Sequence, residues 1–263
     1  MDDFPRNDLE RALQLAATDP AARADFLEML LESRIYVLGH ANSPASGDEI
    51  TISAGDTLSL ANWTHEDGQS YIPFFTSLEA LQQSISGESG YLSFKARELF
   101  DTTRGSHLFL NPGQDFGKEF LPGEVDNLLD HGTSTPVETR VHRAETPVQL
   151  GEPKEYPVEL VEGLTRLFAR HGAIQRAYIA LMQDSSADQP FSLLVGLELD
   201  GNVDLERIGL GHICAEYAPQ GLPVDAMIMR PDDDGPSRYF REASDPFYER
   251  SWGQRLKSFL IHG

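Results

Sequence analysis

The pattern of apolar residues between positions 146 and 229 is the feature that most constrains the fold. After Pro157, Leu160, Leu164 and Phe168 recur at helical spacing, and Gly172 follows the last turn. Two apolar segments, AYIALM and FSLLVGLELD, then have the character of strands. A weaker strand (TPVQLGE) precedes the helix, and a helix over roughly 204–216 and a strand (VDAMIM) follow. The order β-α-β-β-α-β predicts a ferredoxin-like sandwich, followed by an extra carboxyl-terminal segment.

The amino-terminal half alternates helical and extended patterns less regularly. Its expected strands are RIYVLG, SYIPFF, YLSFKA, HLFLN and GKEFL, and its expected helices include one from Pro122 to Gly132. Residues 131–146 contain turn formers and charges without an apolar period, which is typical of a joint between domains. We therefore expect an α+β protein of two domains: a mixed α/β sheet domain over 1–140 and the βαββαβ domain over 141–263.

The segment DGQSYIPFFTSLEALQQSI (67–85) combines a turn, a β-rich run and a helix start. Pro73 cannot donate to a strand ladder, which favours an edge strand or a strand end. Thr76 and Glu79 have the spacing of a capping box, in which each side chain bonds the backbone N–H of the other. We expect the hydroxyls of Thr76 and Ser77 to begin a helix rather than to take part in catalysis.

Composition excludes several classes of function. The formal net charge is −21, and a negative field repels phosphate backbones and anionic lipid, so we expect neither nucleic-acid nor membrane binding. The single cysteine, Cys214, allows no intrachain disulfide and no cysteine-rich zinc site. The first residues resemble no signal peptide, and no apolar run approaches the ~20 residues that span a bilayer. The sequence thus predicts a cytoplasmic protein.

The motifs that could carry chemistry are incomplete. GQDFGKE (113–119) lacks the spacing and the Ser or Thr of a phosphate-binding loop, and GLGHIC (209–214) lies within an expected helix. PDDDGPS (231–237) lacks the alternation of an EF-hand loop, and the eight histidines have no metal-binding spacing. Cys214 and His212 are two apart on a helix, so they do not face each other. We assign no catalytic residue, no cofactor and no metal ligand, and we expect no enzyme.

The carboxyl-terminal segment DPFYERSWGQRLKSFLIHG is aromatic and locally basic in an acidic chain. As a helix it aligns Tyr248 with Trp252, and its basic residues include Arg250 and Arg255. Because Trp, Tyr and Arg anchor many interfaces, Tyr248, Arg250, Trp252 and Arg255 are candidates for contact with a protein partner or for self-association. The alternative is that this stripe packs on the sheet of the protein itself.

Several segments resemble a bacterial family, the enhanced serine sensitivity (SseB) proteins. DGQSYIPFFTSLEALQQSI and LFLNPGQDFGKEFLPGEV are similar to the amino-terminal domain of that family, and LTRLF, LLVGLELDG and PFYERSWGQRL to its carboxyl-terminal domain. The resemblance implies two domains and favours protein partners. It implies no catalytic residue or cofactor.

Three functions remain open, of which the sequence favours the first and ranks the third last. The first is a non-enzymatic regulatory or adaptor protein that acts through protein contacts. The second is a sensor that binds an amino acid such as serine, by analogy with ferredoxin-like domains that do so. The third is an enzyme of serine or sulfur metabolism that uses the only thiol, Cys214. A pocket with convergent polar groups would favour the sensor, and an exposed apolar patch would favour the adaptor.

Overall fold

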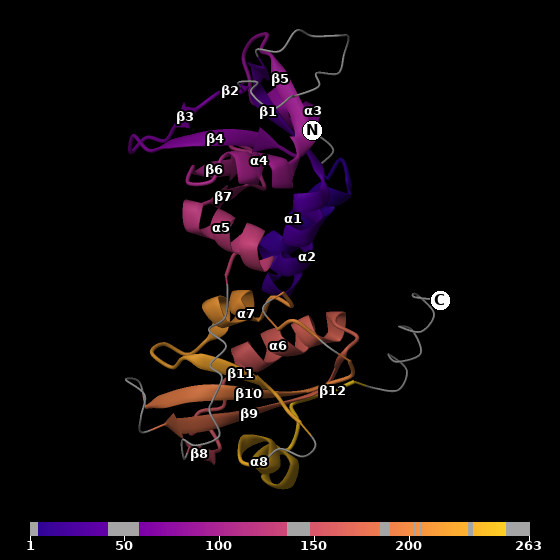
Figure 1. Ribbon diagram of the computed structural model, residues 1–263, viewed down its shortest axis with the longest axis vertical. Helices are drawn as coiled ribbons and strands as arrows, with labels where there is room; N and C mark the ends of the chain where they lie inside the picture. The colour runs from indigo at the N-terminus through magenta and orange to yellow at the C-terminus, as the bar shows by residue number, and fades with distance from the viewer. Residues whose placement is uncertain are drawn as a thin grey trace, which may run out of the picture. The chain divides into compact units, whose positions relative to one another are not determined.

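The computed structural model describes residues 5–41, 58–135, 148–184, 190–201, 203–205, 207–230 and 234–250. The chain divides into two compact units, Met1–Ser134 and Thr135–Gly263 (Figure 1). The division lies within the segment 131–146 that the sequence indicates as a joint. Each unit combines helices with a sheet of parallel and antiparallel pairs, so the α+β class is confirmed.

The described part of the amino-terminal unit contains a sheet in the order β2-β1-β4-β6-β7, with β5 beside β1 and β3 beside β4. Strands β4 and β6 are parallel, and the other pairs are antiparallel. The strands are β1 (Arg34–Ala41), β2 (Leu58–Leu60), β3 (Trp63–Thr64), β4 (Ser70–Phe75), β5 (Tyr91–Lys95), β6 (Leu108–Leu110) and β7 (Lys118–Phe120). The helices are α1 (Asp8–Thr18), a 3-10 turn (Pro20–Ala22), α2 (Arg23–Glu32), α3 (Leu78–Gln83), α4 (Ala96–Thr102) and α5 (Pro122–His131).

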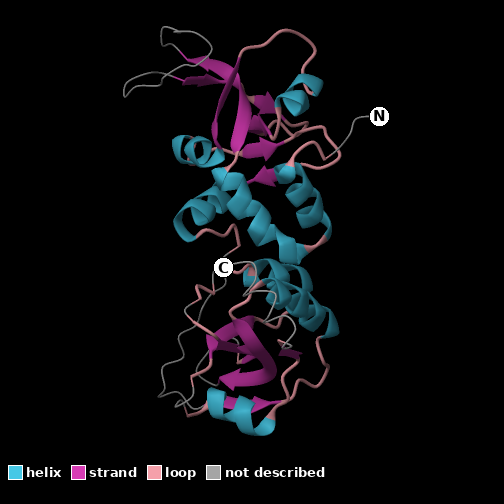
Figure 2. Ribbon diagram, turned by 90° about the vertical axis from the view of Figure 1, so that its right-hand side faces the viewer, coloured by secondary structure: helices cyan, strands magenta, loops and turns pink. Residues whose placement is uncertain are grey.

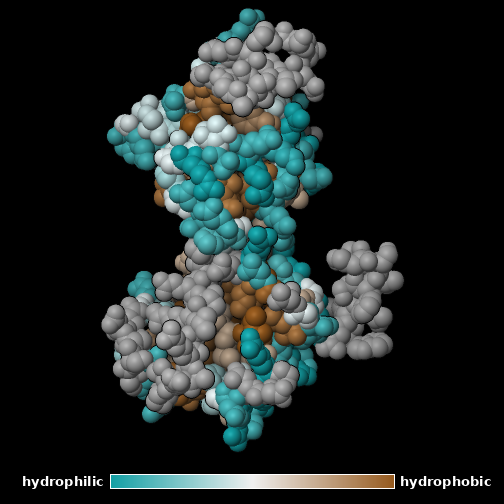
Figure 3. All heavy atoms as spheres, viewed as in Figure 1, coloured by the Kyte–Doolittle hydropathy of each residue, from teal (hydrophilic) through white to brown (hydrophobic). Residues whose placement is uncertain are grey.

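The main core of this unit lies between one face of the sheet and helices α1, α2, α4 and α5. Phe74 from β4, Phe100 from α4 and Phe120 from β7 are fully buried there, with ring centroids 5.2–6.0 Å apart. Helix α3 covers part of the opposite face, where Phe75 packs with Leu81. The outward surface over α1, α2 and α5 is mostly hydrophilic (Figure 3), as expected for amphipathic helices.

The position of Pro73 corrects the expectation of an edge strand. β4 lies inside the sheet, between β6 and the strands β1 and β3. Pairing with β3 ends at Tyr71, and pairing with β1 begins at Phe74. Pro73 is tolerated because its missing N–H falls between these two short partners.

The described part of the carboxyl-terminal unit has a sheet in the order β11-β10-β9-β12, with β8 also beside β9. Helix α6 lies on one face and α8 on the other (Figures 1 and 2). The strands are β8 (Val148–Gly151), β9 (Ile174–Asp184), β10 (Phe191–Leu199), β11 (Val224–Ile228) and β12 (Tyr248–Glu249). The helices are α6 (Val158–Arg170), α7 (Leu210–Tyr217) and α8 (Pro236–Ala243). The sequence did not indicate α8, because the helix begins at Pro236, within the turn formers of 231–237.

The ferredoxin-like arrangement expected for this unit is not confirmed. That arrangement places another strand between the two parallel strands of each βαβ unit. Here β10 and β11 are parallel but adjacent, and β8 pairs with β9 instead of with β10. The pairing places Val148 and Leu150 against the cluster of Met182 and Phe240. Residues 251–263, the extra carboxyl-terminal segment, lie outside the described residues.

Within the described part of the chain, no helix combines the length and apolar character that crossing a bilayer requires.

Candidate ligand-binding site

A hollow of about 580 Å³ lies on the α3 side of the amino-terminal sheet. Three segments form it: the residues that precede α1, the start of β1 and the junction from β4 to α3. Its lining residues are Arg6, Asn7, Arg34, Tyr36, Thr76, Ser77, Leu78 and Glu79. The volume falls within the range of roughly 300–1,000 Å³ that small-molecule sites have.

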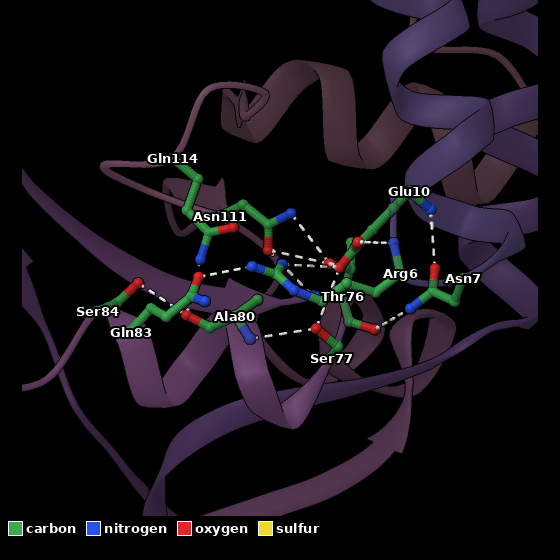
Figure 4. A network of polar contacts seen from close by, with 10 residues as sticks. All are labelled: Arg6, Asn7, Glu10, Thr76, Ser77, Ala80, Gln83, Ser84, Asn111 and Gln114. Atoms are coloured by element: carbon green, nitrogen blue, oxygen red, sulfur yellow. Dashed lines mark hydrogen bonds and ion pairs between the residues drawn. The ribbon is translucent and has the colours of Figure 1, made fainter. Parts of the chain in front are cut away.

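The fully buried carboxylate of Glu10 organises the floor of this hollow (Figure 4). Its Oε1 accepts hydrogen bonds from Thr76 Oγ1 (2.7 Å), Ser77 Oγ (3.1 Å) and Arg6 Nη1 (3.4 Å). Its Oε2 accepts from the backbone N–H of Arg6 (2.6 Å). A buried carboxylate is stable only with such partners, so the charge of Glu10 fixes the positions of Arg6 and of both hydroxyls.

Two asparagines join the helix start to the strand ends. Asn7 caps α1, its Oδ1 accepting from the N–H of Glu10 (2.8 Å), and its Nδ2 donates to the carbonyl of Thr76 (3.2 Å). Asn111 follows β6 with φ of 50°, in the left-handed region that asparagine tolerates better than most residues. Its Oδ1 accepts from the N–H of Thr76 (3.0 Å) and its Nδ2 donates to the Thr76 hydroxyl (3.0 Å). Hydrogen bonds from Asn7 and from Asn111 therefore both hold Thr76, at the junction from β4 to α3.

The expected capping box is wrong by one residue. Ser77, not Thr76, caps α3, its hydroxyl accepting from the N–H of Ala80 (3.1 Å). The hydroxyl of Thr76 instead donates to Glu10 and accepts from Asn111. Local spacing does not distinguish two neighbouring hydroxyl residues, and the choice depends on Glu10, which is distant in sequence.

The lining of the hollow carries charges of both signs. Arg6 is held by Glu10 and by Gln83, to which its Nη2 donates (2.6 Å), and these two side-chain bonds use two of its five guanidinium N–H groups. Arg34 is exposed, and its Nη1 donates to the carbonyl of Ser93 (3.4 Å). Glu79 is also exposed. Cationic and anionic groups that face one hollow fit a small zwitterion.

A second hollow of similar volume lies between the end of β1 and residues 84–90. Among the described residues, its lining consists mainly of Gly, Ser and apolar side chains, with His40 as the one ionisable group. Because these residues offer no opposite charges, it is the weaker candidate for an ionic ligand.

Of the four residues expected to contact a partner, Tyr248 and Arg250 fall within the described part of the chain. Tyr248 and Glu249 form β12 beside β9 instead of a helix. Tyr248 is buried and its hydroxyl donates to the carbonyl of Phe168 (3.2 Å). Arg250 is also buried, and its Nε donates to the carbonyl of Ile174 (3.4 Å). Both pack on the sheet of the protein itself, while Trp252 and Arg255 lie outside the described residues.

Two residues of the incomplete motifs have other surroundings. The ammonium group of Lys118, in the segment 113–119, pairs with Glu124 (2.9 Å), and Cys214 lies on α7. Burial raises the pKa of the Cys214 thiol to about 12, which leaves very little nucleophilic thiolate near neutral pH.

Sequence patterns did not indicate Arg6, Glu10, Arg34 or Asn111, because no motif surrounds them. Nor did they indicate a cluster of His65, His107 and Glu119, which lie just after β3, just before β6 and on β7. The signal in each case is a chemically active residue at or near a strand or helix end, which becomes informative only when the strand order is known.

Comparison with known proteins places the chain in a family. Residues 9–127 match the SseB protein N-terminal domain, and residues 142–250 match the SseB protein C-terminal domain. The chain is 36% identical to Protein SseB of Escherichia coli (strain K12) and of Shigella flexneri over 254 residues, which covers 97% of this chain and 96% of each relative. No solved structure is significantly similar. Two matched domains and a full-length relationship show that this chain belongs to the SseB family.

Proposed function

We propose that this protein is a non-catalytic sensor whose amino-terminal domain binds a small zwitterionic amino acid, serine or a close analogue. One observation carries the proposal: in a chain with net charge −21, two arginines converge on one hollow whose described lining also presents a single exposed carboxylate, Glu79. Arg34 and the remaining N–H groups of Arg6 would bind the α-carboxylate, and Glu79 would accept from the α-ammonium group. The name of the family, which refers to serine sensitivity, agrees with this ligand class.

The buried network supports binding because it holds the hollow in one conformation before a ligand arrives. Glu10, Asn7 and Asn111 fix the backbone at Thr76 and Ser77 through hydrogen bonds of 2.7–3.2 Å. A preorganised site avoids the entropy that ordering a loop would otherwise consume during binding.

The chemistry of the described residues around this hollow favours binding without a reaction. The Thr76 hydroxyl donates to a carboxylate that already accepts three other hydrogen bonds, and no histidine is among the described residues that line the hollow. The raised pKa of Cys214 weighs against the thiol-dependent enzyme considered above.

A thermal-shift assay across the amino acids tests the proposal. Ligand at about 100 times its Kd should stabilise the folded protein by roughly 2.7 kcal/mol. We expect a shift with L-serine, and we expect Arg34→Gln and Glu79→Gln to abolish it, since both side chains are exposed and their replacement spares the core. Arg11→Gln, an exposed arginine on α1 outside the hollow, is the matched control and should retain the shift. The absence of any shift across the panel would remove the proposal.

The adaptor function remains a second candidate because of one observation, the aromatic and basic composition of the segment that contains Trp252 and Arg255. A tagged chain should then recover a specific partner, or a second copy of itself, and Trp252→Ala should lose it. If the natural chain and the Trp252→Ala variant recover the same proteins, that result would count against this function.

A further inference from the structure

Three potential metal ligands converge on the face of the amino-terminal sheet opposite to its main core. The nitrogen and oxygen atoms that His65, His107 and Glu119 offer all lie within 4.8 Å of one another. His65 Nε2 is 3.5 Å from Glu119 Oε1, and His107 Nε2 is 3.5 Å from Glu119 Oε2. None of these three residues lines the hollow beside α3.

Strand register explains why residues so far apart in sequence meet. Ile72 pairs with Leu108, which places Tyr71 beside His107, and Phe109 pairs with Glu119. Side chains alternate between the two faces of a strand. Leu108 and Phe120 point into the main core, so Tyr71, His107, Phe109 and Glu119 lie on the opposite face of the sheet. His65 reaches this face from the end of β3, where its backbone N–H donates to the carbonyl of Gln69 (2.9 Å) in the β3–β4 turn.

The histidine rings are held in place by aromatic neighbours. The His65 ring lies 4.3 Å from that of Tyr71 and 5.8 Å from that of Phe109, measured between centroids. The His107 ring lies 5.7 Å from that of His65. Such packing restricts both imidazoles to nearly their present orientations, which lowers the entropy lost when they bind an ion.

The ring nitrogens have buried hydrogen-bonding capacity that the described residues do not satisfy. The side chain of His107 is 5% exposed, and neither of its ring nitrogens has a hydrogen-bond partner among those residues; the same holds for His65 Nε2. Buried polar atoms without partners are rare in native proteins, and where they occur a bound ion can satisfy them. The carboxylate opposite them, Glu119, is accessible to solvent and provides a route of entry.

We infer that His65, His107 and Glu119 bind a divalent transition-metal ion, with Zn²⁺ as the first choice. Two imidazoles and one carboxylate suit Zn²⁺ and ions of similar preference, whereas Ca²⁺ and Mg²⁺ prefer all-oxygen sites. Ligand atoms around tetrahedral Zn²⁺ lie roughly 3.3 Å apart, given bonds of about 2.0 Å, so the two 3.5 Å separations need little adjustment, while the longer separations, up to 4.8 Å, must shorten. Three protein ligands leave at least one position open, as in sites that also bind water or a small anion.

Isothermal titration of the untagged, chelator-treated full chain with Zn²⁺ tests the inference. We expect one ion per chain, and at least tenfold weaker binding for His65→Asn and for Glu119→Gln. Both replacements involve side chains with solvent exposure, so they spare the core. Loading with Co²⁺ should give visible absorption bands that the same variants lose.

His40→Asn and Glu28→Gln are the matched controls, since both residues are exposed and neither belongs to the cluster. They should bind Zn²⁺ as tightly as the natural chain. The inference is overturned if the natural chain binds no stoichiometric ion, if Glu119→Gln binds as tightly as the natural chain, or if the controls lose binding to the same extent.

Discussion

Replacement of Glu10 tests how strongly the buried network holds the site together. Glu10→Ala removes the acceptor of four hydrogen bonds and leaves the guanidinium of Arg6, with a side chain 16% exposed, without its counter-charge. Breaking a buried pair on one side costs about 3–5 kcal/mol. Because Arg6 retains some contact with water, we expect about 3 kcal/mol, a substantial share of the 5–15 kcal/mol that stabilises a typical domain.

Glu10→Gln separates the loss of charge from the loss of volume. Its carbonyl oxygen can still accept from Thr76, Ser77 and Arg6 Nη1, but its amide group then faces the backbone N–H of Arg6. One charged hydrogen bond is lost and two donors oppose each other, so we expect about 1.5–3 kcal/mol. Glu10→Ala should therefore be the most destabilised variant and Glu10→Gln the next. The free energy of unfolding of the surface control Glu28→Gln should stay within ~0.5 kcal/mol of that of the natural chain.

Urea unfolding followed by tryptophan fluorescence measures these values. The chain has two tryptophans, Trp63 in the amino-terminal unit and Trp252 in the other. A Trp252→Phe background leaves Trp63 as the reporter, which matters because two units need not unfold together. If the free energies of unfolding of Glu10→Ala and Glu10→Gln both lie within ~0.5 kcal/mol of the value for the background chain, Glu10 does not organise the site.

Four further outcomes follow from the surroundings of single residues. With its pKa raised to about 12 from 9.0, the Cys214 thiol should react with iodoacetamide about 10³-fold more slowly in the native chain than in urea at pH 8, measured by mass spectrometry. The unfolded thiol ionises first as pH rises above 9, so the native state should also lose stability there, and Cys214→Ala should reduce that loss. A methyl group on Gly196 would lie 2.6 Å from the buried ring of Phe240, so Gly196→Ala should cost about 1–3 kcal/mol by thermal unfolding. Tyr248→Phe removes the bond to Phe168 and should cost about 1 kcal/mol by the same method, whereas no cost would indicate that the hydroxyl serves another role.

Local patterns were sufficient to locate most helices and strands. Pro122 begins α5, and Gly132 ends it in the left-handed conformation with φ of 76°, as the sequence indicates. The apolar spacing after Pro157 likewise predicted α6. These elements follow from spacing and terminal residues, because capping and amphipathicity act within a few turns of the chain.

Pairing between distant strands could not be predicted in the same way. The order of elements along the chain follows from local patterns, but these patterns do not distinguish β8 beside β9 from β8 beside β10. The error at Tyr248 has a related cause. Helical spacing aligned it with Trp252, while its actual environment is set by its pairing with β9 and by the carbonyl of Phe168.

Both proposed sites depend on such distant contacts. The hollow needs Glu10 to meet Thr76 across 66 residues, and the proposed metal site needs His65, His107 and Glu119 to meet through the register of β4, β6 and β7. Neither set has a characteristic spacing in the sequence. A search for residues of the right chemistry at neighbouring strand ends would find them only after the topology is known.

Titration of the isotopically labelled full chain with L-serine, followed by amide NMR, measures most directly whether the hollow binds an amino acid. We expect saturable shifts of the amides of Asn7, Arg34, Ser77 and Glu79, with those of the carboxyl-terminal unit unchanged. Shifts centred elsewhere, or none at concentrations that saturate ordinary amino-acid sites, would contradict binding in this hollow.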